Sequence, residues 1–323
     1  MVPLSTVNRQ CSSGLQAVAN VAASIQAGHY DIGIAAGVES MSINSMKDAA
    51  PSLDTDFVRA SGEARDVLLP MGVTSENVAE RYGVGRAEQH PSLSLAVRRG
   101  FDEFAAASHK KASLAQEHGL FDAEIVAVQA SVADKDGSRR DILVAKDEGV
   151  RPGTTPERLA ALKPVFKKAG STTAGNSSQV SDGAAAALLT TRAKAEELGL
   201  PLLGVFRSYA VVGVPPAVMG IGPAAAIPVA VSRAGLGLGD VDVYEINEAF
   251  ASQASYCVKE LGLDPSRVNP KGGAIALGHP LGCTGCRQVA TLLHELRRTG
   301  GRRGVVSMCI GTGMGAAAVL EAC

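Results

Sequence analysis

Two parts of the chain share one pattern of helix and strand, and this internal repeat limits the folds that are possible. Aligning residues 14–33 with residues 285–304 places Val18 on Val289 and Ala19 on Ala290. In both copies a helical segment with small side chains leads into an apolar strand. Such self-similarity is typical of a fold built from related structural units. The sequence therefore predicts two similar α/β halves packed together.

The first half begins with a strand–helix–strand pattern. Residues 2–7 predict a short strand, residues 12–26 a helix that ends at Gly28, and residues 31–39 a second strand. We interpret this order as a parallel-sheet unit, and the unbroken apolar run of the second strand predicts burial on both of its faces. From about residue 41 to residue 170, charged helices and short strands indicate an insertion between sheet elements.

Composition and charge disfavour several classes of protein. The 323-residue chain has 31 Lys and Arg against 32 Asp and Glu, a net charge of −1, which does not suit nucleic-acid binding by bulk charge. Six cysteines in a chain of this length do not form a disulfide scaffold, which favours a reducing compartment. No apolar run approaches the roughly 18 residues of a membrane span, and neither end matches a signal peptide or a Ser-Lys-Leu address.

Cys11 is the first candidate for chemistry. It lies between a predicted strand and a predicted helix, where the positive end of the helix dipole favours the nucleophilic thiolate. The alternative is a small buried hydrophobic residue. The following Ser-Ser-Gly favours the chemical interpretation, because it lets a ligand approach backbone N–H groups closely.

Three further segments carry candidate residues. His279 is fixed between a glycine and a proline in a Gly-rich loop, where it could act as a base near neutral pH. Cys309 ends a strand before a glycine-dense turn whose amides could form an oxyanion hole, although such turns also occur simply as tight connections. Asn247, in the run Tyr-Glu-Ile-Asn-Glu-Ala-Phe, would alone be interpreted as a helix cap.

The pair Cys283 and Cys286 has a spacing found in zinc and redox sites. A zinc site requires a second ligand pair, which the sequence does not supply. We therefore predict neither metal binding nor redox chemistry for this pair.

Together, the segments Asn-Arg-Gln-Cys-Ser-Ser-Gly, Asn-Glu-Ala-Phe, Gly-His-Pro and Cys-Ile-Gly-Thr-Gly resemble the thiolase family, most closely its peroxisomal 3-ketoacyl-CoA type. The likeness runs from about Val2 to Leu320. It implies an α/β fold with two similar mixed-sheet halves in a layered αβαβα arrangement and an inserted loop domain. The expected division is an N-terminal half from residues 1–43 and 171–197, a loop domain at 44–170, and a C-terminal half at 198–323.

The resemblance also assigns roles. Cys11 is the nucleophile that carries the acyl group, His279 activates it, and Cys309 is the acid and base at the acetyl-CoA carbon. Asn247 holds a water that forms one oxyanion hole with His279, and the amides of Cys11 and Gly311 form the other. The implied reaction is thiolytic cleavage of a 3-ketoacyl-CoA by CoA, with ping-pong kinetics through acyl-Cys11. CoA is then a co-substrate, and no metal or other cofactor is implied.

Weaker matches concern the substrate. Ser178 and Arg151 fall where the family contacts CoA, while Met219 and Met71 line the acyl end. Pro70 stands where short-chain members usually have histidine, which favours the longer-chain degradative type. The resemblance further implies a homodimer if the N-terminal half is complete, located in the peroxisome or otherwise in the cytoplasm. Charge and hydropathy, as above, predict no nucleic-acid partner and no membrane span.

Two departures from the family pattern leave alternatives open. The two βα units that usually precede the nucleophile strand are missing, so we expect an incomplete N-terminal half, and residues 90–101 interrupt a family-like run. We hypothesise that both arise from gene modelling or splicing. The alternatives are a truncated, inactive protein that binds acyl-CoA or a partner, and a condensing acetyl-CoA acetyltransferase, which Cys309 disfavours. A papain-like protease does not fit the residues around Cys11.

Overall fold

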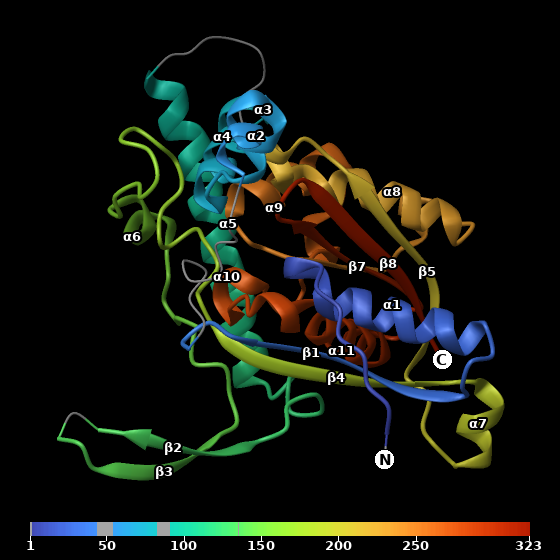
Figure 1. The fold of residues 1–323 in the computed structure, drawn as a ribbon. Coiled ribbons are helices and arrows are strands. Elements are labelled where there is room, and N and C mark those ends of the chain that lie inside the picture. The colour runs from blue at the N-terminus through green and yellow to red at the C-terminus, as the bar shows by residue number, and fades with distance from the viewer. Residues whose placement is uncertain (1, 44–53, 83–90, 135) are drawn as a thin grey trace.

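The computed structural model describes residues 2–43, 54–82, 91–134 and 136–323 (Figure 1). The strands are β1 (Ile32–Ser40), β2 (Val128–Ala133), β3 (Arg139–Val144), β4 (Asp182–Thr190), β5 (Gly204–Gly213), β6 (Val243–Ile246), β7 (Arg303–Ile310) and β8 (Met314–Ala322). The α-helices are α1 (Ser13–Gln26), α2 (Thr55–Ala60), α3 (Gly62–Val67), α4 (Met71–Tyr82), α5 (Pro91–Glu117), α6 (Pro156–Ala160), α7 (Arg192–Glu197), α8 (Gly222–Arg233), α9 (Ala251–Glu260), α10 (Ala274–Leu277) and α11 (Leu281–Thr299).

A four-stranded sheet in the order β5-β8-β7-β6 forms the centre of the molecule. The pair β6 and β7 is parallel, and the other two pairs are antiparallel. One face packs on α8, through side chains such as Ile227 and Val305. The opposite face packs on α1 and α11, through side chains such as Leu15, Leu292 and Met308. Because both faces are covered, β7 and β8 consist largely of buried apolar residues.

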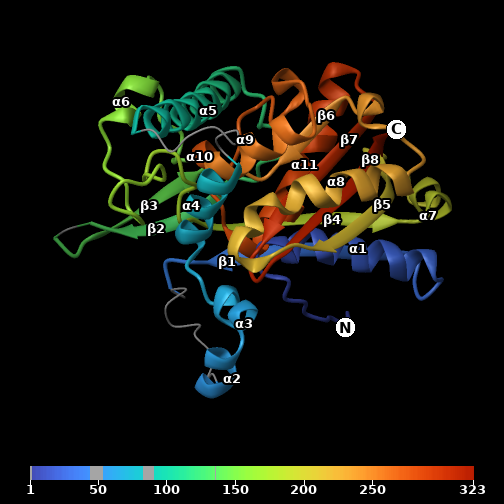
Figure 2. The same cartoon turned by 90° about the horizontal axis from the view of Figure 1, so that it is seen from above.

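A second sheet contains β1 and β4 and lies on the other side of α1 and α11 (Figures 1 and 2). The two strands are antiparallel, from Ile32 opposite Thr190 to Ser40 opposite Asp182. The layers are therefore sheet, helices, sheet and helices. This arrangement agrees with the expected α/β class, but among the described residues no helices cover the outer face of β1 and β4, so the expected αβαβα arrangement lacks one outer helical layer.

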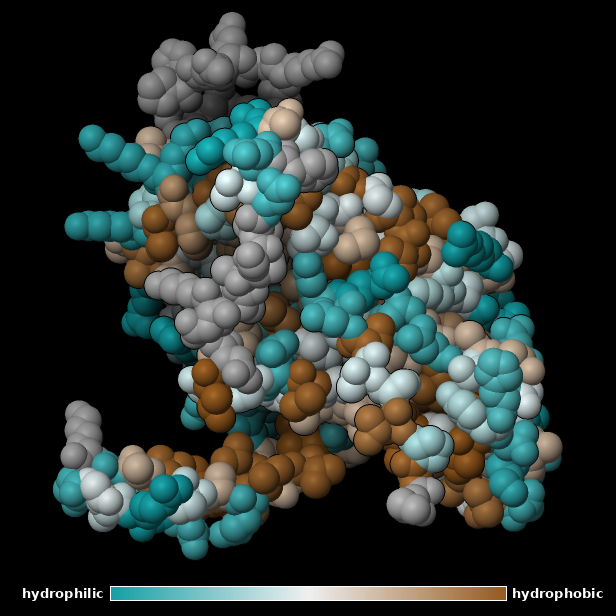
Figure 3. Space-filling model, in the orientation of Figure 1, coloured by the Kyte–Doolittle hydropathy of each residue, from teal (hydrophilic) through white to brown (hydrophobic). Residues whose placement is uncertain are grey.

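The structure corrects three expectations for the first half. Residues 2–7 are irregular rather than a strand, and the pairing of β1 with β4 is antiparallel rather than parallel. The strand β1 is also buried on one face only: Ala35 and Gly37 face the helices, whereas Val38 is 72% exposed. Helices α1 and α11 cover only the inner face, so apolar side chains of β1 and β4 lie on the surface. Figure 3 shows apolar residues, in brown, at several places on one face of the molecule.

The two copies of the internal repeat meet at the contact between α1 and α11. A Cβ at Gly14 would lie 2.7 Å from the carbonyl oxygen of Gly282 and 2.8 Å from the amide nitrogen of Cys286. A Cβ at the aligned residue Gly285 would lie still closer to the amide nitrogen of Leu15. Glycine is needed at both positions because the two helix backbones touch there.

The inserted segment contains α2 to α6 and the β2–β3 hairpin, which projects from the body of the molecule (Figure 1). Helix α5 packs on α6, α9 and α10, and its Phe101 and Ala105 are buried with Ile275. Most of the 90–101 segment thus forms the first turns of α5, while His90 lies outside the described residues.

One described stretch, Pro216–Arg233, is long and apolar enough to cross a membrane by length and composition alone. It includes α8, and over half of it is buried inside the protein. A buried core helix meets the same criterion, and this stretch corrects the expectation that no apolar run approaches the length of a membrane span.

Candidate active site

Cys11 lies in a turn of 3-10 helix, Gln10–Ser12, directly before α1. Gln10 adopts a positive φ of 48°, which is uncommon for a residue with a side chain. The turn is held by Ser13, whose hydroxyl donates to the carbonyl of Gln10 at 2.7 Å and accepts from the amide of Arg9 at 2.9 Å. This geometry fixes the thiol at the base of a helix, in contact with the central sheet.

The thiol of Cys11 is protonated at neutral pH. Burial raises its pKa to about 11, although the backbone N–H groups of Gly311 and of Cys11 itself both favour the thiolate. The expected thiolate is therefore wrong for the ligand-free protein, because the cost of desolvating the charge exceeds the stabilisation by these amides. The two amides predicted to form an oxyanion hole do converge on this sulfur.

His279 is buried beside Asn247, as the resemblance implied. Its Nε2 lies 3.2 Å from Asn247 Nδ2, and its Nδ1 lies 2.6 Å from Thr284 Oγ1. Burial and, to a smaller extent, the positive charge of Arg287 together lower the pKa of His279 to about 3. The imidazole is consequently neutral at physiological pH and can accept a proton.

Asn247 is positioned by the end of β6. Its amide donates to the carbonyl of Ser307 on β7 at 2.8 Å, which extends the parallel ladder by one residue. The side chain of Asn269 pairs with the backbone of Ile246, accepting from its N–H and donating to its C=O, each at 2.8 Å. Asn247 is thus held by the sheet and not by a role as a helix cap.

Cys309 lies at the end of β7 and is fully buried. It packs in one cluster with Met219 and Ala249, with Met71 and Phe250 against it. Desolvation raises the pKa of Cys309 well above its usual value, and the neighbouring thiol of Cys11 raises it further. The predicted acyl-end residues Met219 and Met71 therefore lie beside the predicted acid and base.

Gly311 follows in the turn after β7. A Cβ there would approach the side chain of Gln10 and lie 2.7 Å from Cε of Met71. A side chain at this position would therefore displace Gln10 or Met71 next to Cys11, and the backbone N–H of Gly311 lies within reach of the Cys11 sulfur.

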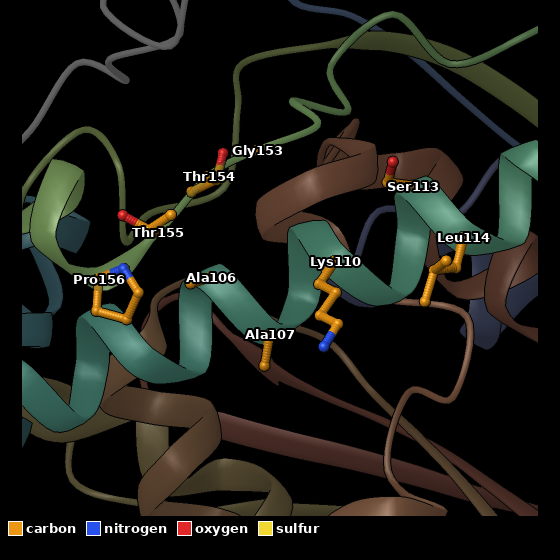
Figure 4. A pocket seen from close by; sticks show the side chains of 9 residues that line it. All are labelled: Ala106, Ala107, Lys110, Ser113, Leu114, Gly153, Thr154, Thr155 and Pro156. Carbon is orange, nitrogen blue, oxygen red and sulfur yellow. The ribbon is translucent and has the colours of Figure 1, made fainter.

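The two predicted CoA contacts lie in different surroundings. Ser178 donates its backbone N–H to the carbonyl of Ala249 at 3.0 Å, which joins it to the Asn-Glu-Ala-Phe segment. Arg151 is exposed, and its amide donates to Nδ1 of His109 at 3.2 Å. Close by, α5 and residues 153–156 line a shallow hollow of about 360 Å³, with Lys110 on its wall (Figure 4).

Glu248 and Thr284 hold the site but were not singled out from the sequence. The carboxylate of Glu248 accepts from Ser108 Oγ at 2.6 Å, Asn269 Nδ2 at 2.8 Å and the amide of Ile275 at 3.3 Å. Burial raises the pKa of Glu248. Its place inside the Asn-Glu-Ala-Phe motif was the available signal, whereas Thr284 had none beyond lying five residues after His279.

The described residues contain no group of three or more His, Cys, Asp or Glu side chains that could hold a metal ion. Burial raises the pKa of Cys283 to about 11 and that of Cys286 to about 12. Both are therefore neutral thiols, which neither bind metal nor attack disulfides well.

Comparisons with known proteins agree with this geometry. Residues 1–193 match the family "Thiolase, N-terminal domain", and residues 200–322 match "Thiolase, C-terminal domain". The chain is 65% identical over 321 residues to the peroxisomal 3-ketoacyl-CoA thiolase of Homo sapiens, spanning 99% of this chain and 72% of that protein. It is 59% identical over 323 residues to peroxisomal 3-ketoacyl-CoA thiolase 2 of Arabidopsis thaliana, with 99% and 67% spanned.

Solved structures show the same fold. The dimeric peroxisomal thiolase of Saccharomyces cerevisiae superposes with a TM-score of 0.86 at 49% identity, spanning 98% of this chain and 75% of that one. Human mitochondrial 3-ketoacyl-CoA thiolase gives a TM-score of 0.84 at 37% identity, spanning 99% and 79%. These matches confirm the α/β thiolase-like fold expected from the four motifs, and the chain belongs to the thiolase family.

Proposed function

We propose that this chain cleaves 3-ketoacyl-CoA with CoA, giving acetyl-CoA and an acyl-CoA shortened by two carbons. The observation that carries the proposal is that two neutral thiols, Cys11 and Cys309, are buried next to each other, while a neutral imidazole, His279, is buried beside Asn247 at the end of the neighbouring strand β6. The names of its relatives, which are 3-ketoacyl-CoA thiolases, point to the same reaction.

In the first half-reaction the sulfur of Cys11 attacks the ketone carbon of the substrate while its proton passes to His279. Neither the thiolate nor the imidazolium is stable alone in this buried site, so proton transfer accompanies formation of the S–C bond. The ketone oxygen becomes negative and accepts hydrogen bonds from the amides of Cys11 and Gly311. Donors that are already fixed in place stabilise this charge without reorganisation.

The carbon–carbon bond next to the ketone then breaks, and its electron pair moves to acetyl-CoA as an enolate. The enolate oxygen receives hydrogen bonds from Nε2–H of His279 and from the water that Asn247 holds, and the thiol of Cys309 protonates the carbon. Acetyl-CoA leaves, and the shortened acyl group remains on Cys11.

In the second half-reaction CoA takes the acyl group from Cys11. The thiolate of Cys309 accepts the proton of the CoA thiol, whose sulfur attacks the acyl carbon. The new oxyanion again lies at the amides of Cys11 and Gly311. When the tetrahedral intermediate collapses, Cys11 leaves as the thiolate and recovers its proton from His279, which returns every group to its starting state.

We assign the substrate contacts by position in the site. Met71 and Met219, beside Cys309, form the wall around the acyl chain near the reacting carbon. Ser178 and the exposed Arg151 contact the CoA moiety farther out. CoA enters as a co-substrate, and the mechanism requires no metal.

The assembly and location follow from relatives. The neighbouring structure from Saccharomyces cerevisiae is a dimer, which supports a homodimer for this chain. The human and Arabidopsis relatives are peroxisomal, which supports the peroxisome as its compartment in fatty-acid β-oxidation.

Steady-state thiolysis tests the proposal. Purified protein is mixed with CoA and a long-chain 3-ketoacyl-CoA, and acetyl-CoA release is measured. We expect turnover in the wild type and a loss of at least about 10³-fold in Cys11→Ser. Cys323→Ser, which changes an exposed thiol at the C-terminus, is the matched control and keeps full activity.

The same experiment separates the alternatives. Acyl-CoA binding without acetyl-CoA release would indicate an inactive binding protein. Formation of acetoacetyl-CoA from acetyl-CoA that is faster than thiolysis would favour a condensing acetyltransferase. Full activity in Cys11→Ser would contradict the proposal.

A further inference from the structure

The two ring nitrogens of His279 have different partners, and these partners determine which nitrogen carries the proton. Nδ1 faces the hydroxyl of Thr284 at 2.6 Å, and Nε2 faces the side-chain amide of Asn247 at 3.2 Å. All three side chains are buried. A neutral imidazole has one nitrogen that donates a hydrogen bond and one that accepts. One neighbour must therefore act as the acceptor and the other as the donor.

The hydroxyl of Thr284 has a single hydrogen, which it can give either to the carbonyl oxygen of Pro280 or to Nδ1 of His279. Thr284 Oγ1 donates to the carbonyl oxygen of Pro280 at 3.0 Å, across the first turn of α11. A carbonyl oxygen can only accept, so an Oγ1 that donates to Pro280 presents lone pairs toward His279. In that arrangement the hydrogen bond between Thr284 and His279 uses a proton on Nδ1.

With the side-chain amide of Asn247 oriented as it is in this structure, the contact on the other side of the ring leads to the same assignment. Asn247 directs its Nδ2, which can only donate, toward Nε2 of His279. Nε2 must then accept, so it carries the free electron pair. Both neighbours thus favour the Nδ1–H tautomer.

We propose that Thr284 is a positioning residue that holds His279 in the Nδ1–H tautomer, so that Nε2 is the base. The inference rests on the proposed function for its catalytic consequence, although the tautomer itself can be measured without substrate. In the other tautomer Nε2 would already carry a proton and could not accept the one from Cys11.

The same arrangement serves the second task of His279. When Nε2 takes the proton of Cys11, the electron pair of the S–H bond forms the new S–C bond, and Nδ1–H remains bonded to Thr284. The proton on Nε2 then becomes the hydrogen-bond donor that the enolate oxygen requires. Fixing the tautomer therefore sets both the base and the later oxyanion donor.

The positive charge of Arg287 disfavours the protonated form of His279. Its guanidinium is paired with Glu245 at 3.4 Å and lies near enough to His279 to disfavour a second proton on the ring. The imidazole is therefore neutral before substrate binds and carries a single proton. The tautomer decides which of its two nitrogens holds that proton.

The direct test is ¹⁵N NMR of the substrate-free protein labelled at histidine. The chain has six histidines, and the signals that disappear in His279→Asn identify His279. We expect an unprotonated Nε2 and a protonated Nδ1 in the wild type. A protonated Nε2 would overturn the proposal whether or not the protein is an active thiolase.

Variants of Thr284 extend the test to reactivity. We expect Thr284→Val, which removes the hydroxyl at nearly constant volume, to give mixed tautomers and to slow alkylation of Cys11 by iodoacetamide about tenfold or more. In thiolysis it lowers kcat with little change in KM for CoA. Thr284→Ser keeps the hydroxyl and restores both the NMR signature and the alkylation rate.

Thr291→Val is the matched control, because Thr291 is equally buried and lies two turns farther along α11. It should leave the tautomer and the alkylation rate unchanged. A Thr284→Val protein with the wild-type tautomer and the wild-type rate would contradict the positioning role. If Thr284→Val does not fold, the wild-type spectrum and Thr284→Ser still decide the question.

Discussion

At the scale of single residues, burial determines the charge states in the site. The pKa of Cys11 is raised to about 11 and that of His279 is lowered to about 3, chiefly because each is desolvated. The reacting pair is therefore neutral before substrate arrives. A neutral pair avoids the cost of a buried charge until the oxyanion donors can stabilise the new negative oxygen.

The low pKa of His279 predicts how stability changes with pH. In the unfolded chain a histidine gains its proton near pH 6.5, but in the folded protein His279 remains neutral down to about pH 3. The unfolded state thus binds more protons between these values. The free energy of unfolding should fall as the pH drops below 6.5, by a contribution approaching about 1.4 kcal/mol per pH unit.

Urea unfolding of wild type and His279→Gln at pH 7, 6 and 5 measures this contribution. The variant lacks the titrating group, so its stability should decline less steeply. Thr291→Val has no titrating change and should run parallel to the wild type. Parallel curves for wild type and His279→Gln would contradict the buried, neutral imidazole.

The motifs in the sequence located Cys11, His279, Asn247, Cys309 and Gly311, yet they could not give the protonation state of the thiol. The thiol is desolvated by elements that the fold brings from distant segments, because β7 and α11 pack on the 3-10 turn that holds Cys11. Thr284 and Glu248 were missed for the same reason. Their importance lies in hydrogen bonds whose geometry exists only in the folded chain.

At the scale of elements, the contact between α1 and α11 sets the position of Cys11. Gly14 lies three residues after the nucleophile, at the point where the two helix backbones meet. Helix α11 also carries Thr284, the hydrogen-bond partner of His279. The distance between the helices therefore controls how the two halves of the site face each other.

We predict that Gly14→Ala destabilises the protein by about 1–3 kcal/mol, because its Cβ would meet backbone atoms that cannot move independently. Thermal or urea unfolding measures the change. The control is Gly100→Ala in α5, where a Cβ meets nothing within 4 Å and alanine favours the helix by up to about 1 kcal/mol. Equal stability of Gly14→Ala and wild type would show that the helices can separate at no cost.

Elements with strong local patterns were predicted well, and those that depend on a distant partner were not. The predicted helix at 12–26 corresponds to α1, and the predicted strand near 31–39 corresponds to β1. Residues 2–7 have the composition of a strand but are irregular, because a strand requires a hydrogen-bonded neighbour. The antiparallel partner of β1 is β4, about 150 residues later, which no local pattern reveals.

At the scale of the whole molecule, buried polar contacts tie the inserted segment to the central sheet. Lys271, which precedes the Gly-rich loop of His279, pairs with Glu124 at 2.7 Å and lies over the ring of Phe121. Both charged side chains are almost completely buried. Ser108 of α5 and Glu248 form a second such link.

We expect Lys271→Met to destabilise the protein by about 3–5 kcal/mol, because Glu124 would remain buried without its partner. Adding Glu124→Gln to Lys271→Met should recover part of the loss, since the uncompensated charge is removed. Urea unfolding of the two variants provides the comparison. A double variant less stable than Lys271→Met would contradict this account of the pair.

The internal repeat predicted two related halves, and its aligned glycines, Gly14 and Gly285, do lie on either side of one contact. The division at residues 1–43 with 171–197, 44–170 and 198–323 stays a prediction. The burial of β1 on only one face was not predictable, because an apolar run does not indicate whether other elements pack on one face of the strand or on both.

The central claim is that Cys11 carries the acyl group, and mass spectrometry of the protein with a 3-ketoacyl-CoA in the absence of free CoA tests it most directly. Without CoA the second half-reaction cannot occur, so the acyl-enzyme accumulates. We predict one shortened acyl group per chain, located on Cys11 after digestion, with one equivalent of acetyl-CoA released. An adduct on another cysteine, or acetyl-CoA release without any adduct, would contradict the account.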